Sequence, residues 1–124
     1  MIKILTIDDE KEFTDMIKNY FEPRGYTVYV AHDGERGVAV ANTEKPDIVL
    51  IDLKMPGRHG DQVLLELIKS CPNIIPIMIT ASEGEGKVRE KLIEMGAYEC
   101  FDKPLSSLKD LEMKIKEGLA NGKA

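Results

Sequence analysis

The 124-residue sequence contains no tryptophan, only two cysteines, and fewer basic than acidic residues. Cys71 and Cys100 lie far apart without the spacing of metal ligands, so we expect two reduced, buried thiols. The formal net charge of -5 argues against direct binding of nucleic acid, which normally requires a basic surface. These shortages exclude a disulfide-stapled protein, a zinc site and a nucleic-acid-binding module.

Long hydrophobic runs are also missing. The longest apolar stretch is far shorter than a membrane span, and the segment Met1–Ile4 lacks the layout of a signal peptide. We therefore expect a cytoplasmic protein without membrane insertion. With 43% hydrophobic residues, the length suits one compact domain over residues 1–124, with its core at 2–119 and a short tail at 120–124.

Apolar runs alternate with amphipathic segments along the whole chain. The run Ile48–Ile51 has no polar alternation, which is typical of a strand covered on both faces. Pro76 should lie near the start of its strand, where its missing amide hydrogen is tolerated. The predicted strands are 2–7, 27–30, 48–52, 74–79 and 98–101, and the predicted helices are 13–21, 34–43, 63–71, 83–95 and 108–119. This alternation predicts a parallel sheet in a three-layer α/β/α sandwich.

Two strand orders are common in such sheets, the dinucleotide-binding order and the flavodoxin-like order. The first strand is not followed by Gly-x-Gly-x-x-Gly, and the chain has no Gly-x-x-x-x-Gly-Lys phosphate loop. The dinucleotide fingerprint is therefore missing.

Polar residues stand at the ends of four predicted strands. Because parallel strands point the same way, these ends should meet at one edge of the sheet: Asp8, Asp9, Asp52, Thr80 and Lys103. Three neighbouring carboxylates repel one another unless a cation lies among them. Oxygen ligands without a nearby histidine or cysteine favour Mg²⁺, which usually also binds phosphate oxygens. The edge therefore predicts a magnesium site that receives a phosphoryl group.

The combination of these motifs resembles the receiver domain of two-component response regulators. The resemblance rests on Asp8-Asp9, on Asp52 followed by Met55-Pro56-Gly57, on Thr80-Ala81 and on Lys103-Pro104, and it covers 2–119. It implies a flavodoxin-like, five-stranded parallel sheet of order 2-1-3-4-5 with five helices. It also implies a phosphorylatable signalling switch that processes no external substrate.

The resemblance assigns a role to each residue at the strand ends. Asp52 is implied to be the phosphoacceptor, while Thr80 and Lys103 bind phosphoryl oxygens. Mg²⁺ is implied to bind Asp9 directly, Asp8 through water, Asp52, and the backbone carbonyl of Lys54. Lys54 and Ser82 are implied to modulate the access of water to the acyl phosphate, and the Lys103–Pro104 peptide bond is implied to be cis.

One position departs from the family pattern. Many receivers carry an aromatic residue three positions before the lysine, where this chain has Cys100. Phe101 follows it, but consecutive residues of a strand point to opposite faces, so Phe101 cannot replace the missing aromatic. The inward aromatic movement that accompanies switching in this family is therefore in question here.

The resemblance also implies protein partners. A sensor histidine kinase or a histidine phosphotransfer protein would dock on the segment 13–20 and the loop after Lys103, and a target protein would bind near the charged helix 83–95. The chain is expected to be a monomer or to dimerise on phosphorylation. The start at Met1 and the short tail favour a stand-alone regulator over a receiver excised from a longer protein.

The same residues also allow structural explanations and other functions. Asp8, Asp9 and Glu10 could simply cap the following helix, and His32 and His59 are expected to be solvated. A phosphatase of the haloacid-dehalogenase type would need an aspartate two positions after its nucleophile, where this chain has Lys54. A flavodoxin-like electron carrier lacks support because no phosphate loop follows the first strand and no tryptophan is present.

Overall fold

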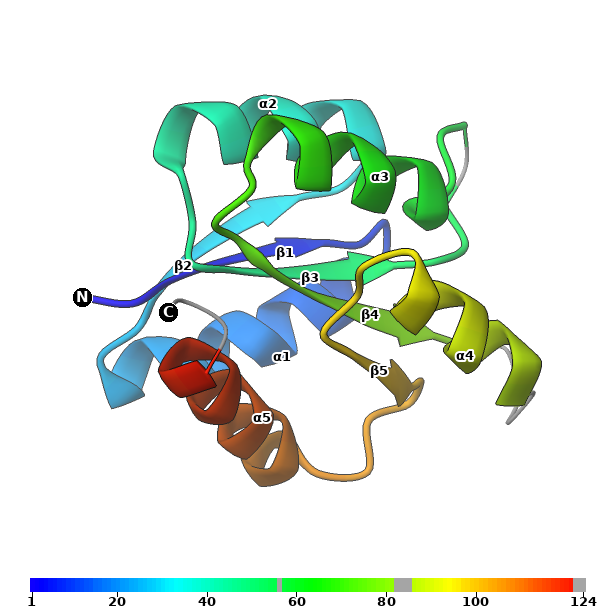
Figure 1. The fold of residues 1–124 in the computed structure, drawn as a ribbon. Coiled ribbons are helices and arrows are strands. Elements are labelled where there is room, and N and C mark those ends of the chain that lie inside the picture. The colour runs from blue at the N-terminus through cyan, green and yellow to red at the C-terminus, as the bar shows by residue number, and fades with distance from the viewer. Residues whose placement is uncertain (56, 82–85, 122–124) are drawn as a thin grey trace.

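The computed structural model describes residues 1–55, 57–81 and 86–121. Within these residues five strands alternate with five α-helices. Figure 1 shows how they are arranged. The strands are β1 (Lys3–Ile7), β2 (Thr27–Ala31), β3 (Ile48–Asp52), β4 (Ile75–Thr80) and β5 (Glu99–Asp102). The helices are α1 (Lys11–Phe21), α2 (Gly34–Glu44), α3 (Gly60–Ser70), α4 (Gly86–Glu94) and α5 (Leu108–Asn121), with a short 3-10 turn, η1 (Glu22–Arg24), after α1.

All strand pairs are parallel, and the sheet has the order β2-β1-β3-β4-β5. The predicted flavodoxin-like order 2-1-3-4-5 and the α/β/α sandwich are therefore confirmed. No helix in the described ranges combines the length and the apolar character needed to cross a membrane.

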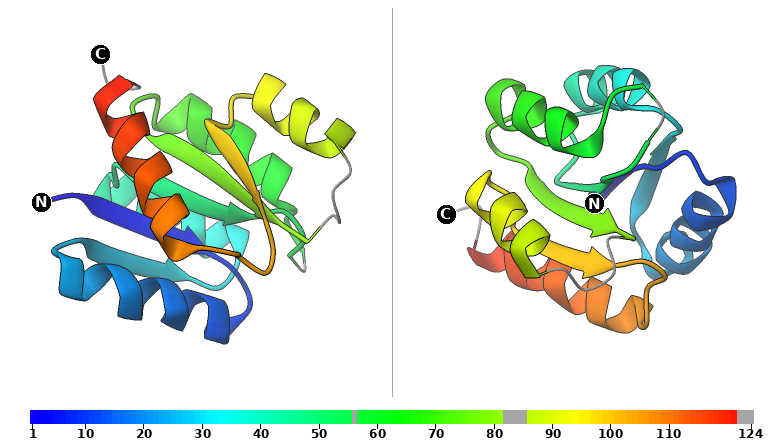
Figure 2. Two further views of the ribbon diagram at one scale, coloured as in Figure 1. Left: turned by 90° about the horizontal axis from the view of Figure 1, so that it is seen from below. Right: turned by 90° about the vertical axis from the view of Figure 1, so that its right-hand side faces the viewer.

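The helices cover the sheet from both sides, which makes the three layers visible in Figures 1 and 2. On one side α1 and α5 bury Ile17 and Ile115 against the sheet. On the other side α2 and α3 bury Ala41 and Leu64, and Leu92 of α4 joins the same cluster. The central strand β3 is buried at every residue from Ile48 to Asp52, as its unbroken apolar run predicts.

Pro76 is the second residue of β4, an interior strand between β3 and β5. Strand β5 begins opposite Ile77, so Pro76 lies beyond the paired part of β5 and no ladder hydrogen bond is lost on that side. The predicted location near the strand start is confirmed.

Helix α3 begins at Gly60, three residues before the apolar stripe that predicted it. The close approach of this first turn to β3 requires glycine. A Cβ at Gly60 would lie 2.2 Å from the backbone oxygen of Asp52 and 2.7 Å from the Cα of Leu53. Gly60 also donates its N–H to the carbonyl of Leu53 at 2.8 Å, which fixes the start of α3 beside the end of β3.

The expectation that both cysteines are buried needs correction, and several other predicted positions lie outside the described residues. Both cysteines are free, but only Cys100 is buried, because Cys71 ends α3 in a half-buried position at the rim of the sheet. The described part of the charged helix is Gly86–Glu94, so its predicted start at Glu83 lies outside the described residues, as do Pro56, Ser82 and the tail 122–124.

Candidate functional site

Backbone hydrogen bonds hold the strand ends together at one edge of the sheet. The N–H of Asp8 donates to the carbonyl of Ala31 at 3.0 Å, which ties the end of β1 to β2. The N–H of Leu53, directly after Asp52, donates to Ile79 at 3.0 Å. The N–H of Lys103 donates to the carbonyl of Thr80 at 2.8 Å. The chain segments that carry the predicted site residues are therefore fixed by their own backbones.

Three carboxylates gather at this edge. One oxygen from each of Asp8, Asp9 and Asp52 lies within 4.8 Å of the other two. Asp8 is 1% exposed and Asp52 is 5% exposed, whereas Asp9 is exposed. Two of the three negative charges are thus removed from water, and the third faces it.

Lys103 places an ammonium group among these carboxylates. Its Nζ donates to Asp8 Oδ2 at 2.8 Å and lies 3.7 Å from Asp52 Oδ2. It also forms an ion pair with Glu10 and lies 4.8 Å above the ring of Phe13. The side chain is only 12% exposed, so the cation is held inside the site and does not reach into solvent.

Burial and charge act together on the pKa values of the site. Burial, followed by the negative charge of Asp8, raises the pKa of Asp52 to about 6, although Lys103 lowers it. Burial also raises the pKa of Asp8, against the hydrogen bond from Lys103. Burial lowers the pKa of Lys103, but its hydrogen bonds to Asp8 and Glu10 outweigh that effect and the net pKa is raised. The site thus has more negative charge than its one lysine can balance.

This donor set fits a divalent cation of the magnesium type. The cluster offers carboxylate oxygens only, which suits a hard cation and excludes a thiolate or imidazole preference. The raised pKa of Asp52 shows that a further positive charge here would be favourable.

Three of the remaining predicted residues, Thr80, Lys54 and Pro104, lie at or just after the ends of strands. Thr80 ends β4 and is 1% exposed, and the register places it beside Asp102. The Lys54 side chain is exposed, and the backbone of Lys54 hydrogen-bonds to Asp52. The Lys103–Pro104 peptide bond is cis, as predicted, and Pro104 is exposed. Ser82 lies outside the described residues.

Cys100 and Phe101 lie on opposite faces of β5, as strand geometry predicts. Cys100 belongs to the core cluster under α2, α3 and α4, and Phe101 packs on the α1 and α5 side. Cys100 pairs with Met78, two residues before Thr80, so Cys100 and Thr80 share a face. Phe101 therefore cannot occupy the space beside Thr80.

Sequence reasoning missed three charged contacts. Helix capping is the alternative that the sequence leaves open for Glu10, but its side chain makes no capping hydrogen bond and pairs with Lys103. Arg89 of α4 donates to the carbonyl of Cys100 at 2.9 Å. Glu112 of α5 is 5% exposed and accepts hydrogen bonds from Tyr20, Arg24 and Tyr26. These partners are distant in sequence, so no local pattern predicts them.

The two histidines are exposed, as expected. The Nδ1 atom of His32 lies 3.1 Å from the backbone oxygen of Asp8. His59 precedes α3, and its backbone N–H donates to Gln62 Oε1 at 3.3 Å. Neither ring is a member of the carboxylate cluster.

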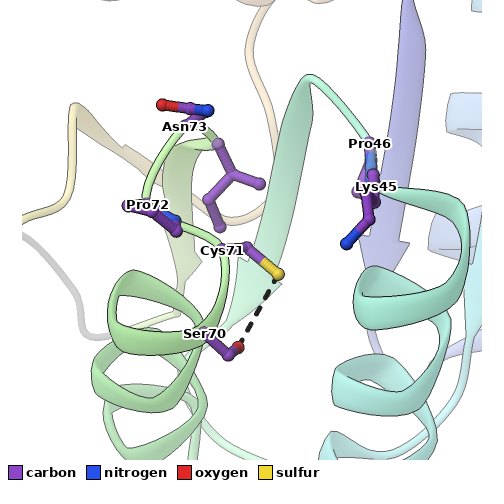
Figure 3. Close-up of a pocket in the computed structure, with 7 residues that line it drawn as sticks. Lys45, Pro46, Ser70, Cys71, Pro72 and Asn73 are labelled. Atoms are coloured by element: carbon purple, nitrogen blue, oxygen red, sulfur yellow. Dashed lines mark hydrogen bonds between the residues drawn. The ribbon is translucent and has the colours of Figure 1, made fainter.

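A separate pocket of about 290 Å³ lies at the opposite edge of the sheet, before β3 and β4 begin (Figure 3). Its lining residues are Lys45, Pro46, Ser70, Cys71, Pro72, Asn73 and Ile74. The Cys71 sulfur lies 3.6 Å from the Ser70 hydroxyl oxygen. Because this pocket is at the amino ends of the strands, it is not part of the carboxylate site.

Comparison with known proteins agrees with this geometry. Residues 4–116 match the response regulator receiver domain family. The receiver domain of Francisella response regulator 1452 is similar, with 28% identity, a TM-score of 0.89, and coverage of 99% of this chain and 100% of that chain. A receiver domain protein from Clostridium thermocellum shows 30% identity and a TM-score of 0.89, covering 99% of this chain and 98% of that one.

A CheY-like receiver domain protein from Methanospirillum hungatei JF-1 is similar at 30% identity, with a TM-score of 0.88 and coverage of 97% of this chain and 94% of that chain. The matched residues include every strand end that contributes to the carboxylate site. Together with the strand order and the family match, this shows that the chain belongs to the response regulator receiver domain family.

Proposed function

We propose that the protein is a signalling switch in which Asp52 accepts a phosphoryl group. The observation that carries the proposal is the position of Asp52, which is buried at a strand end beside Asp8 and 3.7 Å from the Lys103 ammonium. Receiver domains are signalling switches that interact with histidine kinases or phosphotransfer proteins. The family thus provides the class of function, and the geometry supports the choice of residue.

In the proposed reaction a carboxylate oxygen of Asp52 attacks the phosphorus of the donor. A new bond forms between this oxygen and phosphorus, while the bond from phosphorus to the donor breaks and its electron pair leaves with the donor. The product is an acyl phosphate on Asp52. Lys103 then neutralises a phosphoryl oxygen, which requires only a short movement from its position near Asp52.

Asp8, Asp9 and Asp52 are proposed to hold Mg²⁺, together with the backbone carbonyl of Lys54. When bound, the ion supplies positive charge that offsets the repulsion between the carboxylates and an incoming phosphate. Asp9 faces solvent and is suited to bind the ion directly. Asp8 is tied to Lys103 and to the N–H of Glu10, which suits a contact through water.

The proposed output follows from the strand ends. Thr80, at the end of β4, hydrogen-bonds to the new phosphoryl group and moves toward Asp52, which changes the surface that a target protein contacts. Cys100 shares the face of Thr80 but carries no aromatic ring, so the movement reaches β5 and α4 without an aromatic swing. Lys54, at the position of a phosphatase acid, provides no carboxyl group for turnover of an external substrate.

The donor is proposed to be a sensor histidine kinase or a histidine phosphotransfer protein, docked on α1 and on the loop after Lys103.

The proposed site can be tested without knowing the cognate kinase. The protein is incubated with acetyl phosphate and Mg²⁺ and then analysed by intact mass. We expect a gain of one phosphate that requires Mg²⁺ and is lost in Asp52→Asn, because an amide cannot act as the nucleophile.

Asp15→Asn is the matched control, since Asp15 is an exposed aspartate of α1 paired with Lys11 on the helix surface. It should take up phosphate like the wild type. Phosphate uptake by Asp52→Asn equal to that of the control, or no uptake by the wild type with any donor, would contradict the proposal.

The metal ligands need a separate measurement. Asp9→Asn removes one carboxylate from the cluster while leaving the core intact, because Asp9 is exposed. We expect the Mg²⁺ concentration for half-maximal phosphorylation to rise at least tenfold, following the loss expected for a metal-site carboxylate. An unchanged Mg²⁺ titration would remove Asp9 from the ligand set.

A further inference from the structure

Among the residues that the structure describes, Glu10 is the one acidic residue outside the carboxylate cluster that forms an ion pair with Lys103. It follows Asp9 and precedes α1, and its side chain is 64% exposed. Its backbone is held firmly, because its N–H donates to Asp8 at 2.8 Å and its carbonyl accepts from Phe13 and Thr14. The ion pair with Lys103 is the only hydrogen bond or ion pair that its side chain makes within the described residues. The Glu10 carboxylate thus faces solvent and pairs with Lys103, while hydrogen bonds fix its backbone beside the site.

The three ion pairs of Lys103 are not equivalent. Asp8 is buried, and its carboxylate is fixed on both sides by Lys103 and by the N–H of Glu10. Glu10 faces water and can be rehydrated at little cost. Asp52, at 3.7 Å, is beyond the range of a good hydrogen bond to the ammonium. In the unphosphorylated protein the ammonium therefore lies closer to Asp8 and Glu10 than to Asp52.

We propose that Glu10 is a positioning residue that holds the Lys103 ammonium away from Asp52 in the unphosphorylated protein, so that this ion pair weakens when Lys103 moves to bind a phosphoryl oxygen on Asp52. The inference rests on the proposed phosphorylation of Asp52. An ammonium group has three N–H donors, so the number of donors does not limit Lys103. Its position does, because the ammonium lies 3.7 Å from Asp52 while it is paired with Asp8 and Glu10. Glu10 slows phosphorylation by holding the ammonium in this position.

The competition has a definite size. Ion pairs with one well-exposed partner differ little in free energy from their hydrated groups, so removing the pair should accelerate phosphorylation roughly two- to fivefold. If Glu10 only stabilised the start of α1, its substitution would change the phosphorylation rate in the opposite direction, because damage to this helix start would slow the reaction.

The experiment measures the rate of phosphorylation by acetyl phosphate at saturating Mg²⁺, followed by intact mass. Glu10→Gln removes the competing charge at nearly constant shape and should react roughly two- to fivefold faster than the wild type. Glu12→Gln is the matched control, because Glu12 is an exposed acid in the first turn of the same helix without an ion pair in the described structure. It removes the same long-range charge and should react at the wild-type rate.

Glu10→Asp separates contact from charge. Aspartate keeps the negative charge but is one methylene shorter, and at the start of a helix it prefers to accept from helix N–H groups. It should therefore also react faster than the wild type. If Glu10→Asp reacts at the wild-type rate, or if Glu10→Gln is no faster than Glu12→Gln, Glu10 does not position Lys103. Absence of phosphate on the wild type would instead overturn the proposed function, and with it this inference.

Discussion

Replacing Asp52 with asparagine should stabilise the metal-free protein. Asp52 is 5% exposed, and its pKa is raised to about 6 from an ordinary value of 3.8, mainly by burial and by the charge of Asp8. The folded state therefore disfavours the ionised carboxylate. Asparagine has nearly the same shape and no charge, so Asp52→Asn removes this penalty and leaves the packing unchanged.

The sign of the pH dependence follows from the raised pKa. Well below pH 3.8 Asp52 is protonated in both the folded and the unfolded protein, so its burial carries no charge penalty there. Between pH 3.8 and about 6 the unfolded chain ionises Asp52 while the folded protein keeps it protonated, so stability from this group is lost over this range. Above about pH 6 the folded protein ionises Asp52 as well, and the loss is complete. The advantage of Asp52→Asn should therefore be small near pH 4, grow between pH 4 and 6, and stay constant above.

The size of the advantage can be bounded. A difference of about two pH units at about 1.4 kcal/mol per unit gives at most about 3 kcal/mol. Because the site is open to solvent on the side of Asp9, screening reduces this to about 1–2 kcal/mol at pH 7.5. Urea unfolding in the presence of a chelator measures it, with far-UV circular dichroism as the signal because the chain lacks tryptophan.

Excess Mg²⁺ provides the second arm of this test. A ligand that binds only the folded state stabilises it, so Mg²⁺ should raise the stability of the wild type more than that of Asp52→Asn and shrink the difference. Asp15→Asn, at an exposed aspartate of α1, should change the stability at pH 7.5 by less than about 0.5 kcal/mol. A variant at Asp52 that is no more stable than the wild type at pH 7.5, or whose gain grows toward acid, would refute the charge-repulsion reasoning.

Three further substitutions test buried contacts of the fold. Glu112→Gln should cost about 1–3 kcal/mol in urea unfolding because it disrupts a buried acceptor of two tyrosine hydroxyls and an arginine, whereas the exposed Glu66→Gln should cost less than about 0.5 kcal/mol; equal losses would contradict this. Cys100→Tyr should cost about 1–3 kcal/mol, since position 100 is 6% exposed in a packed core, and unchanged stability would show that the aromatic has room. Gly60→Ala should cost about 3 kcal/mol or more because its Cβ would meet the backbone of Asp52, and a fully stable variant would show that α3 can shift away.

The strand ends could be predicted because their proximity is a consequence of topology. Once five apolar runs alternate with helical segments, parallel pairing follows, and residues that end the strands must meet at one edge. Asp8, Asp52 and Lys103 needed no long-range information beyond this rule. The location of Asp9 in solvent was not predictable, because Asp9 lies two residues beyond the end of β1, where the alternation of a strand no longer sets the direction of a side chain.

Helix boundaries were harder to predict than strand ends, because hydrophobic periodicity detects only the buried side of a helix. The first turn of α3 contains Gly60, Asp61 and Gln62, which contribute nothing to an apolar pattern. The structure places this turn against β3 through the backbone of Gly60, and a glycine can do this only because it has no Cβ. In the sequence, nothing distinguishes Gly60 from a glycine in an ordinary loop.

The charge network around Glu112 was hidden for a different reason. Glu112 lies between Leu111 and Ile115 on the inner face of α5, but an isolated glutamate in a helix is normally solvated. Its burial makes sense only with the hydroxyls of Tyr20 and Tyr26, which lie 92 and 86 residues away in the chain. A buried charge is tolerated where such partners are present, and the partners come from the tertiary fold.

The predicted stabilisation by Asp52→Asn links the energetics of the fold to its function. A carboxylate whose ionisation opposes folding is one that a bound cation will relieve, because the cation offsets the negative charge that the site must hold. Lys103 alone does not relieve it, since the ammonium is shared with Asp8 and Glu10 and stays 3.7 Å from Asp52. The same arrangement that makes Asp52 costly in the metal-free protein therefore leaves Lys103 available to respond when the charge on Asp52 changes.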